Sequence, residues 1–162
     1  MSTYAAQNVG AGRLDRVERG VRVGIGLNCA VCLALAAICV PLGRPLMIAL
    51  FQLPEEALQA GMAYLYRVMV PSFILGISYV LGGTLRGAGA VMVATVSGII
   101  ALWIVRVPVA YWMAATWGRD NLFFSYLVGW LSGIAISGVY YLSGRWKSKH
   151  VLGTGNREID GL

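Results

Sequence analysis

Two long apolar runs without a charged residue constrain this sequence more than any other feature. They cover residues 68–85 and 87–105, and each is about long enough to cross the ~30 Å hydrocarbon core of a bilayer as a helix. A helical hairpin of a soluble protein does not need this length. The composition agrees, because 58% of the residues are hydrophobic, only 12% are charged, and the mean hydropathy is +0.70. We therefore expect lipid to be the solvent for most of the chain.

A glycine-rich stretch with one arginine, residues 81–89, lies where the two runs meet. We predict a bend at the membrane surface, with Arg86 as a cytoplasmic anchor, because short loops rich in Lys and Arg stay on the inner side. The glycines of this stretch admit two roles, a hinge for alternating access or a tight turn with close helix packing. They are Gly82, Gly83, Gly87 and Gly89.

The fold class that we predict is an all-α integral membrane protein with four transmembrane helices. The helices cover about residues 23–40, 63–85, 91–116 and 122–142. The domains that we predict are a cytoplasmic leader with the start of a helix (1–20), the transmembrane domain (21–144) and a basic cytoplasmic tail (145–162). We expect the tail to be disordered.

Prolines divide the predicted spans. We expect Pro41, Gly43 and Pro45 to end the first span, because proline cannot continue a regular helix without the loss of backbone hydrogen bonds. Residues 46–53 are apolar but too short to cross a bilayer, so we predict a short connector on the far side. Pro71 is placed to kink the second span.

The basic residues fall mainly on one side of the predicted spans. On that side lie Arg13, Arg16, Arg19, Arg22, Arg86, Arg145, Lys147, Lys149 and Arg157. Toward the other side lie Arg44, Arg67, Arg106 and Arg119. The positive-inside rule therefore predicts that both termini lie in the cytoplasm. We expect a multi-pass protein of the cell (plasma) membrane. The net charge of +6 then indicates contact with membrane lipids, and we expect no nucleic acid as partner.

Arg106 is harder to place at a membrane surface. It lies roughly 20 Å along the third span, and the lean of helical side chains directs it toward the bilayer centre. Pro108 frees the backbone carbonyl of Ile104, which needs another hydrogen-bond donor. Two interpretations stay open: Arg106 with Pro108 lines a transport cavity, or Arg106 bonds the freed carbonyl groups. In the second span, Tyr79 and Ser72 are further candidates for the substrate cavity.

Three motifs in a fixed order resemble the C-terminal third of a multidrug and toxic compound extrusion (MATE) transporter. They are residues 7–12 (Gln-Asn-Val-Gly-Ala-Gly, with Gly10 and Gly12), 85–89 (Leu-Arg-Gly-Ala-Gly) and 106–108 (Arg-Val-Pro). The resemblance covers about residues 4–147. It implies the last four helices of a twelve-helix exporter with two six-helix lobes. It also implies the exchange of amphipathic, often cationic drugs for Na⁺ or H⁺.

The chain departs from the family pattern in its acidic residues. Part of the family uses carboxylates in the seventh and tenth helices for ion coupling, and the span here that matches the tenth contains no acid. All acids lie outside the predicted spans: Asp15, Glu18, Glu55, Glu56, Asp120, Glu158 and Asp160. We expect the missing N-terminal helices, or a second copy, to bind the coupling ion. We expect no cofactor and no metal site, because Cys29 and Cys32 lack a second ligand pair.

Two alternatives remain beside cation-coupled multidrug efflux. A flippase for lipid-linked saccharides would have a similar fold with another substrate. An accessory structural membrane protein would assemble through small-residue faces such as that of Gly129 and Gly133. We do not expect an enzyme, because no nucleophile with its base, acidic pair or metal cluster occurs in or near the spans.

Overall fold

The computed structural model describes residues 1–118 and 121–148, and the regular elements in this part of the chain are all helices. They are α1 (Ser2–Gly10), α2 (Leu14–Phe51), α3 (Glu55–Met69), α4 (Ser72–Gly87), α5 (Val91–Ile99), the π-helix η1 (Ile100–Arg106), α6 (Val107–Thr116), α7 (Phe124–Leu142) and α8 (Arg145–Ser148). Three segments are long and apolar enough to cross a membrane, namely α2, α5–η1–α6 and α7. The bent pair α3–α4 makes a fourth if it counts as one span. The predicted all-α membrane fold is confirmed.

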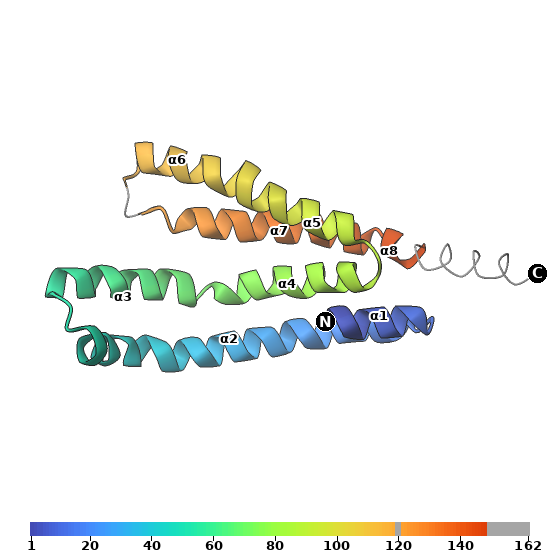
Figure 1. Cartoon of the computed structure of the whole chain (residues 1–162), viewed down its shortest axis with the longest axis horizontal. Helices are drawn as coiled ribbons and strands as arrows, with labels where there is room; N and C mark the ends of the chain where they lie inside the picture. The colour runs from blue at the N-terminus through green and yellow to red at the C-terminus, as the bar shows by residue number, and fades with distance from the viewer. Residues whose placement is uncertain (119–120, 149–162) are drawn as a thin grey trace, which may run out of the picture.

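Helix α4 lies at the centre of the bundle. It packs against α1, α2, α5 and α7, and Figure 1 shows α2 on one side of it and α7 with α5 on the other. The main cluster of buried side chains gathers near the end of the bundle where α1 and α8 lie. Its members are Ala5, Val9, Val17, Leu85, Ala88, Ala90, Ala94 and Trp146. Many large apolar side chains elsewhere are exposed, as expected for helices in contact with lipid or with further helices.

The glycine-rich stretch is not the surface bend that the sequence predicts. Residues 81–87 form the last two turns of α4, and residues 81–85 are buried. The turn itself is confined to residues 88–90, where Gly89 has a φ of +82° that favours glycine.

Close packing explains why a helix forms over these glycines. Gly83 and Gly87 lie one turn apart and face α1. A Cβ atom on Gly87 would collide with the Ser2 carbonyl oxygen and would lie 2.8 Å from the Cβ of Ala5. The glycines lower the helix propensity of α4, but they allow α1 to pack directly on its backbone. The contacts therefore favour the packing role, and the hinge role stays a prediction.

Pro41 and Pro45 do not end the first helix. Helix α2 continues through both prolines to Phe51, so the predicted stop and the predicted connector at residues 46–53 are wrong. The extension packs against α3, where a Cβ on the buried Gly43 would lie 2.5 Å from Leu65 Cδ2. This packing offsets the backbone hydrogen bonds that the prolines remove. Figure 1 shows the end of α2 turned out of line with the rest of the helix.

Pro71 and Pro108 have different effects on their spans. The kink predicted at Pro71 is confirmed, because α3 and α4 meet there at a bend of 42°. Pro108 does not interrupt the third span, which stays helical from Val91 to Thr116. Instead the seven residues before α6 form a π-helix, and the Val107 N–H donates to the Leu102 carbonyl. In a π-helix each N–H donates to the carbonyl five residues earlier. This wider spacing accommodates Pro108, which has no backbone N–H to donate.

The first and the last described helices, α1 and α8, pack onto the bundle. Helix α1 ends as predicted at Gly10, and Gly12 follows with a φ of +71°. Residues 145–148 belong to the tail that we expected to be disordered, but they form α8. The fully buried Trp146 holds this helix on the bundle. Residues 149–162 of the predicted tail, with Lys149 and Arg157, lie outside the described residues, as does Arg119.

Substitution of Gly87 tests the contact between α1 and α4. We expect Gly87→Ala to lower the free energy of unfolding by about 1–3 kcal/mol, because the new methyl group meets backbone atoms of α1. Gly26→Ala on α2, where a Cβ would meet nothing within 4 Å, is the matched control and should not destabilise the protein. Thermal unfolding in detergent, followed by circular dichroism, measures both. Equal stability of the two variants would contradict direct packing of α1 on α4.

Candidate functional site

A cavity of about 490 Å³ lies between α3, α4, α5, η1 and α7. Its walls are mainly apolar, with a few polar and aromatic groups. The lining residues are Val68, Leu75, Ser78, Tyr79, Gly98, Ala101, Leu102, Arg106, Tyr126, Gly129 and Trp130. Among these described residues none is acidic, so the formal charge of the lining is positive. A mostly apolar cavity with few polar groups is typical of small-molecule sites.

Arg106 is the charged group of this cavity. Its guanidinium carbon lies 3.6 Å from the centre of the Tyr126 ring, a cation–π contact between η1 and α7. The contact compensates part of the cost of a cation within a span. Arg106 and Tyr126 also line a second depression, between η1, α6 and the N-terminal end of α7, so this pair is shared by two hollows.

Gly129 makes room for the arginine. A Cβ at this position would lie 3.0 Å from Arg106 Cβ and 3.4 Å from the Ala101 carbonyl oxygen. One turn further along α7, a Cβ on Gly133 would lie 3.0 Å from Ser78 Oγ. Both glycines are buried, so the close helix contact predicted for this pair is confirmed.

Polar contacts connect helices of the cavity with each other and with the neighbouring helix α2. Ser97 Oγ on α5 and Ser137 Oγ on α7 are buried and 3.0 Å apart. Asn28 Nδ2 on α2 donates to the Phe73 carbonyl on α4 at 3.0 Å. A lipid environment offers no competing water, so such contacts help to fix the spacing of the helices.

The cavity brings together two of the four predicted substrate residues. Arg106 and Tyr79 line it, and Tyr79 is 65% exposed. Ser72 and Pro108 do not line it. The Ser72 hydroxyl donates to the Met69 carbonyl at 2.7 Å beside the break between α3 and α4, and Pro108 is exposed. Polarity pointed to Ser72 and the irregular backbone pointed to Pro108, but neither property determines the direction of a side chain.

Sequence reasoning missed Trp130 as a lining residue and the contact between Arg106 and Tyr126. The available signal was the spacing on α7, where Tyr126, Gly129, Trp130 and Gly133 recur at intervals of three, one and three residues and so share one face. The remaining motif residues lie away from the cavity. Gly10 and Gly12 end α1, and Arg86 is exposed in the last turn of α4.

The described carboxylates lie near helix ends. Asp15 and Glu18 are in the first two turns of α2, and Glu55 and Glu56 are in the first turn of α3. Glu18 forms an ion pair with Lys147, and Glu55 accepts a hydrogen bond from Arg44 at 2.9 Å. Over residues 1–118 and 121–148, no three His, Cys, Asp or Glu side chains gather as metal ligands would.

Comparisons with known proteins point to one family. The family model MatE matches residues 1–112. The probable multidrug resistance proteins YoeA and YpnP of Bacillus subtilis are 29% and 27% identical to the chain over 154 and 148 residues. The probable multidrug resistance protein NorM of Pseudomonas aeruginosa is 32% identical over 159 residues.

These alignments cover most of this chain but a minor part of each relative. They include 93%, 91% and 93% of the chain, and 33%, 33% and 32% of YoeA, YpnP and NorM. The chain therefore spans about a third of the length of the curated relatives it matches. No solved structure matches it.

A double-mutant cycle tests the contact between Arg106 and Tyr126. We expect the stability effects of Arg106→Gln and Tyr126→Leu to be coupled by about 0.5–2 kcal/mol, because each substitution removes the same cation–π contact. Tyr140→Leu on the same helix, about 20 Å further along, is the control and should be additive with Arg106→Gln. Unfolding in detergent gives the four free energies of each cycle. Additivity in the first cycle would show that the contact contributes nothing.

Proposed function

The chain belongs to the multidrug and toxic compound extrusion (MatE) family, and from this premise we propose that it forms the C-terminal third of a multidrug efflux transporter. The observation that carries the proposal is the alignment of nearly the whole chain with one third of relatives named multidrug resistance proteins. The membrane-spanning helices and the cavity at Arg106 support it. The remaining helices of a twelve-helix, two-lobe exporter would come from sequence outside this chain or from a second copy.

In this proposal the cavity at Arg106 is part of the substrate pathway. Tyr79, Tyr126 and Trp130 offer aromatic faces, and Leu75 and Leu102 offer apolar ones. Such walls suit flat amphipathic drugs, because apolar surface drives binding while aromatic rings stack on a planar ligand. Arg106 is the one full charge among the described lining residues, and it orients polar groups of a substrate. The π-helix that carries it is a feature often found at functional sites.

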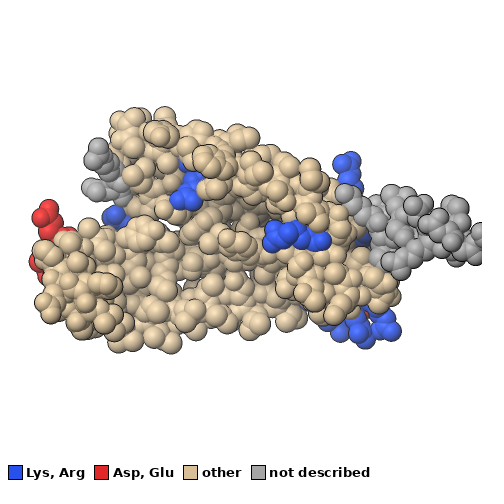
Figure 2. Space-filling model, in the orientation of Figure 1, with Lys and Arg blue, Asp and Glu red and all other residues tan. Residues whose placement is uncertain are grey.

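Export in this scheme exchanges the drug for Na⁺ or H⁺, and the coupling carboxylate comes from other helices. A coupling group needs to ionise at depth in the membrane. The described carboxylates of this chain lie near helix ends, and none lines the cavity. In this proposal both termini face the cytoplasm and the transporter lies in the plasma membrane. The Lys and Arg side chains at the end of the bundle with α1 and α8 (Figure 2) support this orientation through the positive-inside rule.

One observation weighs against the accessory structural protein. That alternative needs a small-residue face that is free to meet a partner. Gly129 and Gly133, the pair on α7 with this character, already face Arg106 and Ser78 within the chain. The close contacts therefore favour a role inside one bundle.

Substitution of Arg106 tests the substrate pathway. In cells that express the transporter containing this chain, we expect Arg106→Ala to slow the export of a fluoroquinolone roughly tenfold, because the contact between the guanidinium group and the carboxylate of the drug is lost. Arg44→Ala is the matched control, since Arg44 carries the same charge on an exposed side chain that does not line the cavity. Membrane levels of both variants are matched by immunoblot. Unchanged export by Arg106→Ala would remove this residue from the pathway, and absence of export by the wild type would contradict the efflux function.

Reconstitution of the 162-residue chain alone tests the origin of the coupling group. We expect neither a Na⁺ nor a proton gradient to drive dye export from liposomes that contain only this chain, because its described carboxylates lie at the bundle ends. Liposomes with the full transporter that contains this chain provide the positive control. Gradient-driven export by the chain alone, abolished when the gradient is collapsed, would contradict the proposal.

A further inference from the structure

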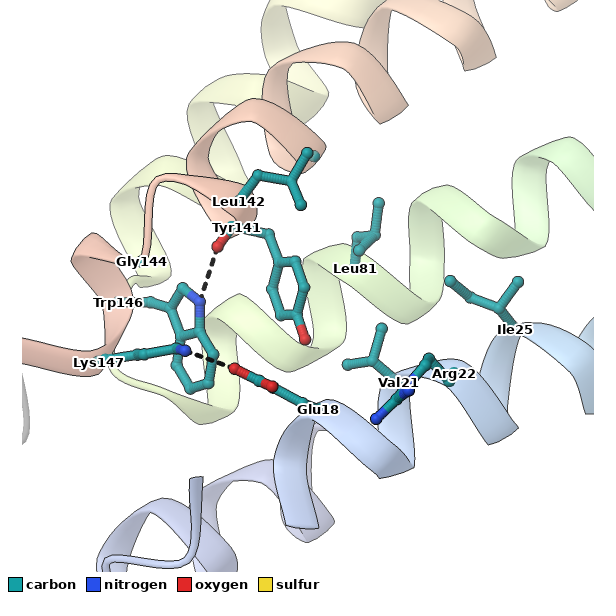
Figure 3. A pocket seen from close by; sticks show the side chains of 11 residues that line it. Glu18, Val21, Arg22, Ile25, Leu81, Tyr141, Leu142, Gly144, Trp146 and Lys147 are labelled. Carbon is teal, nitrogen blue, oxygen red and sulfur yellow. Dashed lines mark hydrogen bonds and ion pairs between the residues drawn. The ribbon is translucent and has the colours of Figure 1, made fainter. Parts of the chain in front are cut away.

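A separate cleft opens at the basic end of the bundle, between α2, α4, α7 and α8 (Figure 3). Its volume is about 480 Å³. The residues that line it are Glu18, Val21, Arg22, Ile25, Leu81, Gly138, Tyr141, Leu142, Gly144, Trp146 and Lys147. Only Leu81 comes from α4, which forms the floor between α2 and α7.

The charged groups of this cleft leave one unneutralised cation. Glu18 on α2 pairs with Lys147 on α8. Arg22, one turn along α2 from Glu18, has no carboxylate partner in the described part of the chain. The described lining therefore carries two cations and one anion, a net charge of +1. An anionic group is the complement of this charge.

The cleft changes from charged to apolar along the direction of the helices. Glu18, Arg22 and Ile25 follow one another at intervals of four and three residues, so they share a face of α2. The charged pair lies at the end of the bundle, and Ile25 lies further into the predicted span. On the opposite wall the apolar Leu142 is 83% exposed, so this part of the cleft is open to the side. A phospholipid has the same order of polarity along the membrane normal.

Tyr141 is held in place at the mouth. Its ring stacks on Trp146 with 5.5 Å between ring centres and 7° between planes, and the Trp146 indole N–H donates to the Tyr141 carbonyl at 2.9 Å. Figure 3 shows the Tyr141 ring directed from α7 toward α2, into the space between Glu18 and Leu81. A rigid hydroxyl donor and a guanidinium on opposite walls suit a phosphate group.

We infer that this cleft is a binding site for one anionic phospholipid, with the phosphate between Arg22 and Tyr141 and an acyl chain along Ile25, Leu81 and Leu142. Charge complementarity and the polarity gradient favour this occupant over a further helix, which would have to place an anion at the same depth. A general attraction of headgroups to basic residues would involve all exposed arginines alike. Arg22 lines this cleft and Arg19 does not, so a lipid bound in the cleft would depend on Arg22 and not on Arg19. The inference depends on membrane insertion and not on drug export.

Native mass spectrometry of the protein purified from mixed micelles tests the site. We expect one retained phosphatidylglycerol and weak retention of phosphatidylcholine. Arg22→Gln should weaken phosphatidylglycerol binding about tenfold, because a charge-assisted contact is lost. Arg19→Gln, which removes the same charge from the same helix outside the cleft, should leave it unchanged. Circular dichroism checks that both variants keep the helical content of the wild type.

Three results would overturn the inference. Equal loss of lipid in the two arginine variants would show attraction by the basic surface as a whole. Displacement of the lipid by millimolar glycerol phosphate would show a site for free phosphate. Absence of a retained lipid from the full transporter extracted from its own membrane, although the chain alone retains one, would show that another helix fills the cleft.

Discussion

The structure depends on close approach of helices at small residues. In a bilayer, burial of apolar side chains between helices brings little gain over contact with lipid tails, so tight backbone contact and internal polar bonds decide the packing. Helix α4 is central because it offers such contacts on several sides. Gly83 and Gly87 receive α1, Gly76 receives the Asn28 side chain of α2, and Ser78 meets Gly133 of α7. Without these contacts the other helices would have no fixed distance from α4.

The same close contacts create the cavity and determine its charge. Because Gly129 has no side chain, Arg106 fits between η1 and α7 and stacks on Tyr126. The arginine thus stays within the span without a carboxylate among its described neighbours, and the aromatic ring compensates part of the desolvation cost. This arrangement leaves a positive, aromatic-walled cavity, whereas the described carboxylates remain near helix ends. In the proposed transporter, the substrate would contact this cavity, and the coupling ion would bind to other helices.

Hydrophobic run length and residue order predicted the larger features of the fold. The apolar spans α2, α5–η1–α6 and α7, the kink at Pro71, the end of α1 at Gly10 and the glycine contact on α7 follow from local rules that tertiary structure did not override. The glycine stretch and the prolines of α2 show where local rules fail. Packing of α1 on Gly87 and of α3 on Gly43 outweighs poor helix propensity, and no local pattern reveals which distant segment supplies that packing. The cavity was predicted at Arg106 and Tyr79 but missed at Trp130, since the spacing on α7 groups residues on one face without showing which helix that face meets.

The central claim is that successive ends of the helical spans lie on opposite sides of the membrane. Cysteine labelling in sealed vesicles measures this topology directly. In a background without Cys29, Cys32 and Cys39, single cysteines replace Arg13, Pro54, Arg86 and Trp117, which lie in sequence at successive ends of the helical spans. The account predicts that a membrane-impermeant maleimide labels positions 13 and 86 from one side only, and positions 54 and 117 from the other side only. Labelling of positions 54 and 86 from the same side would contradict it, because α3 and α4 would then not form one span.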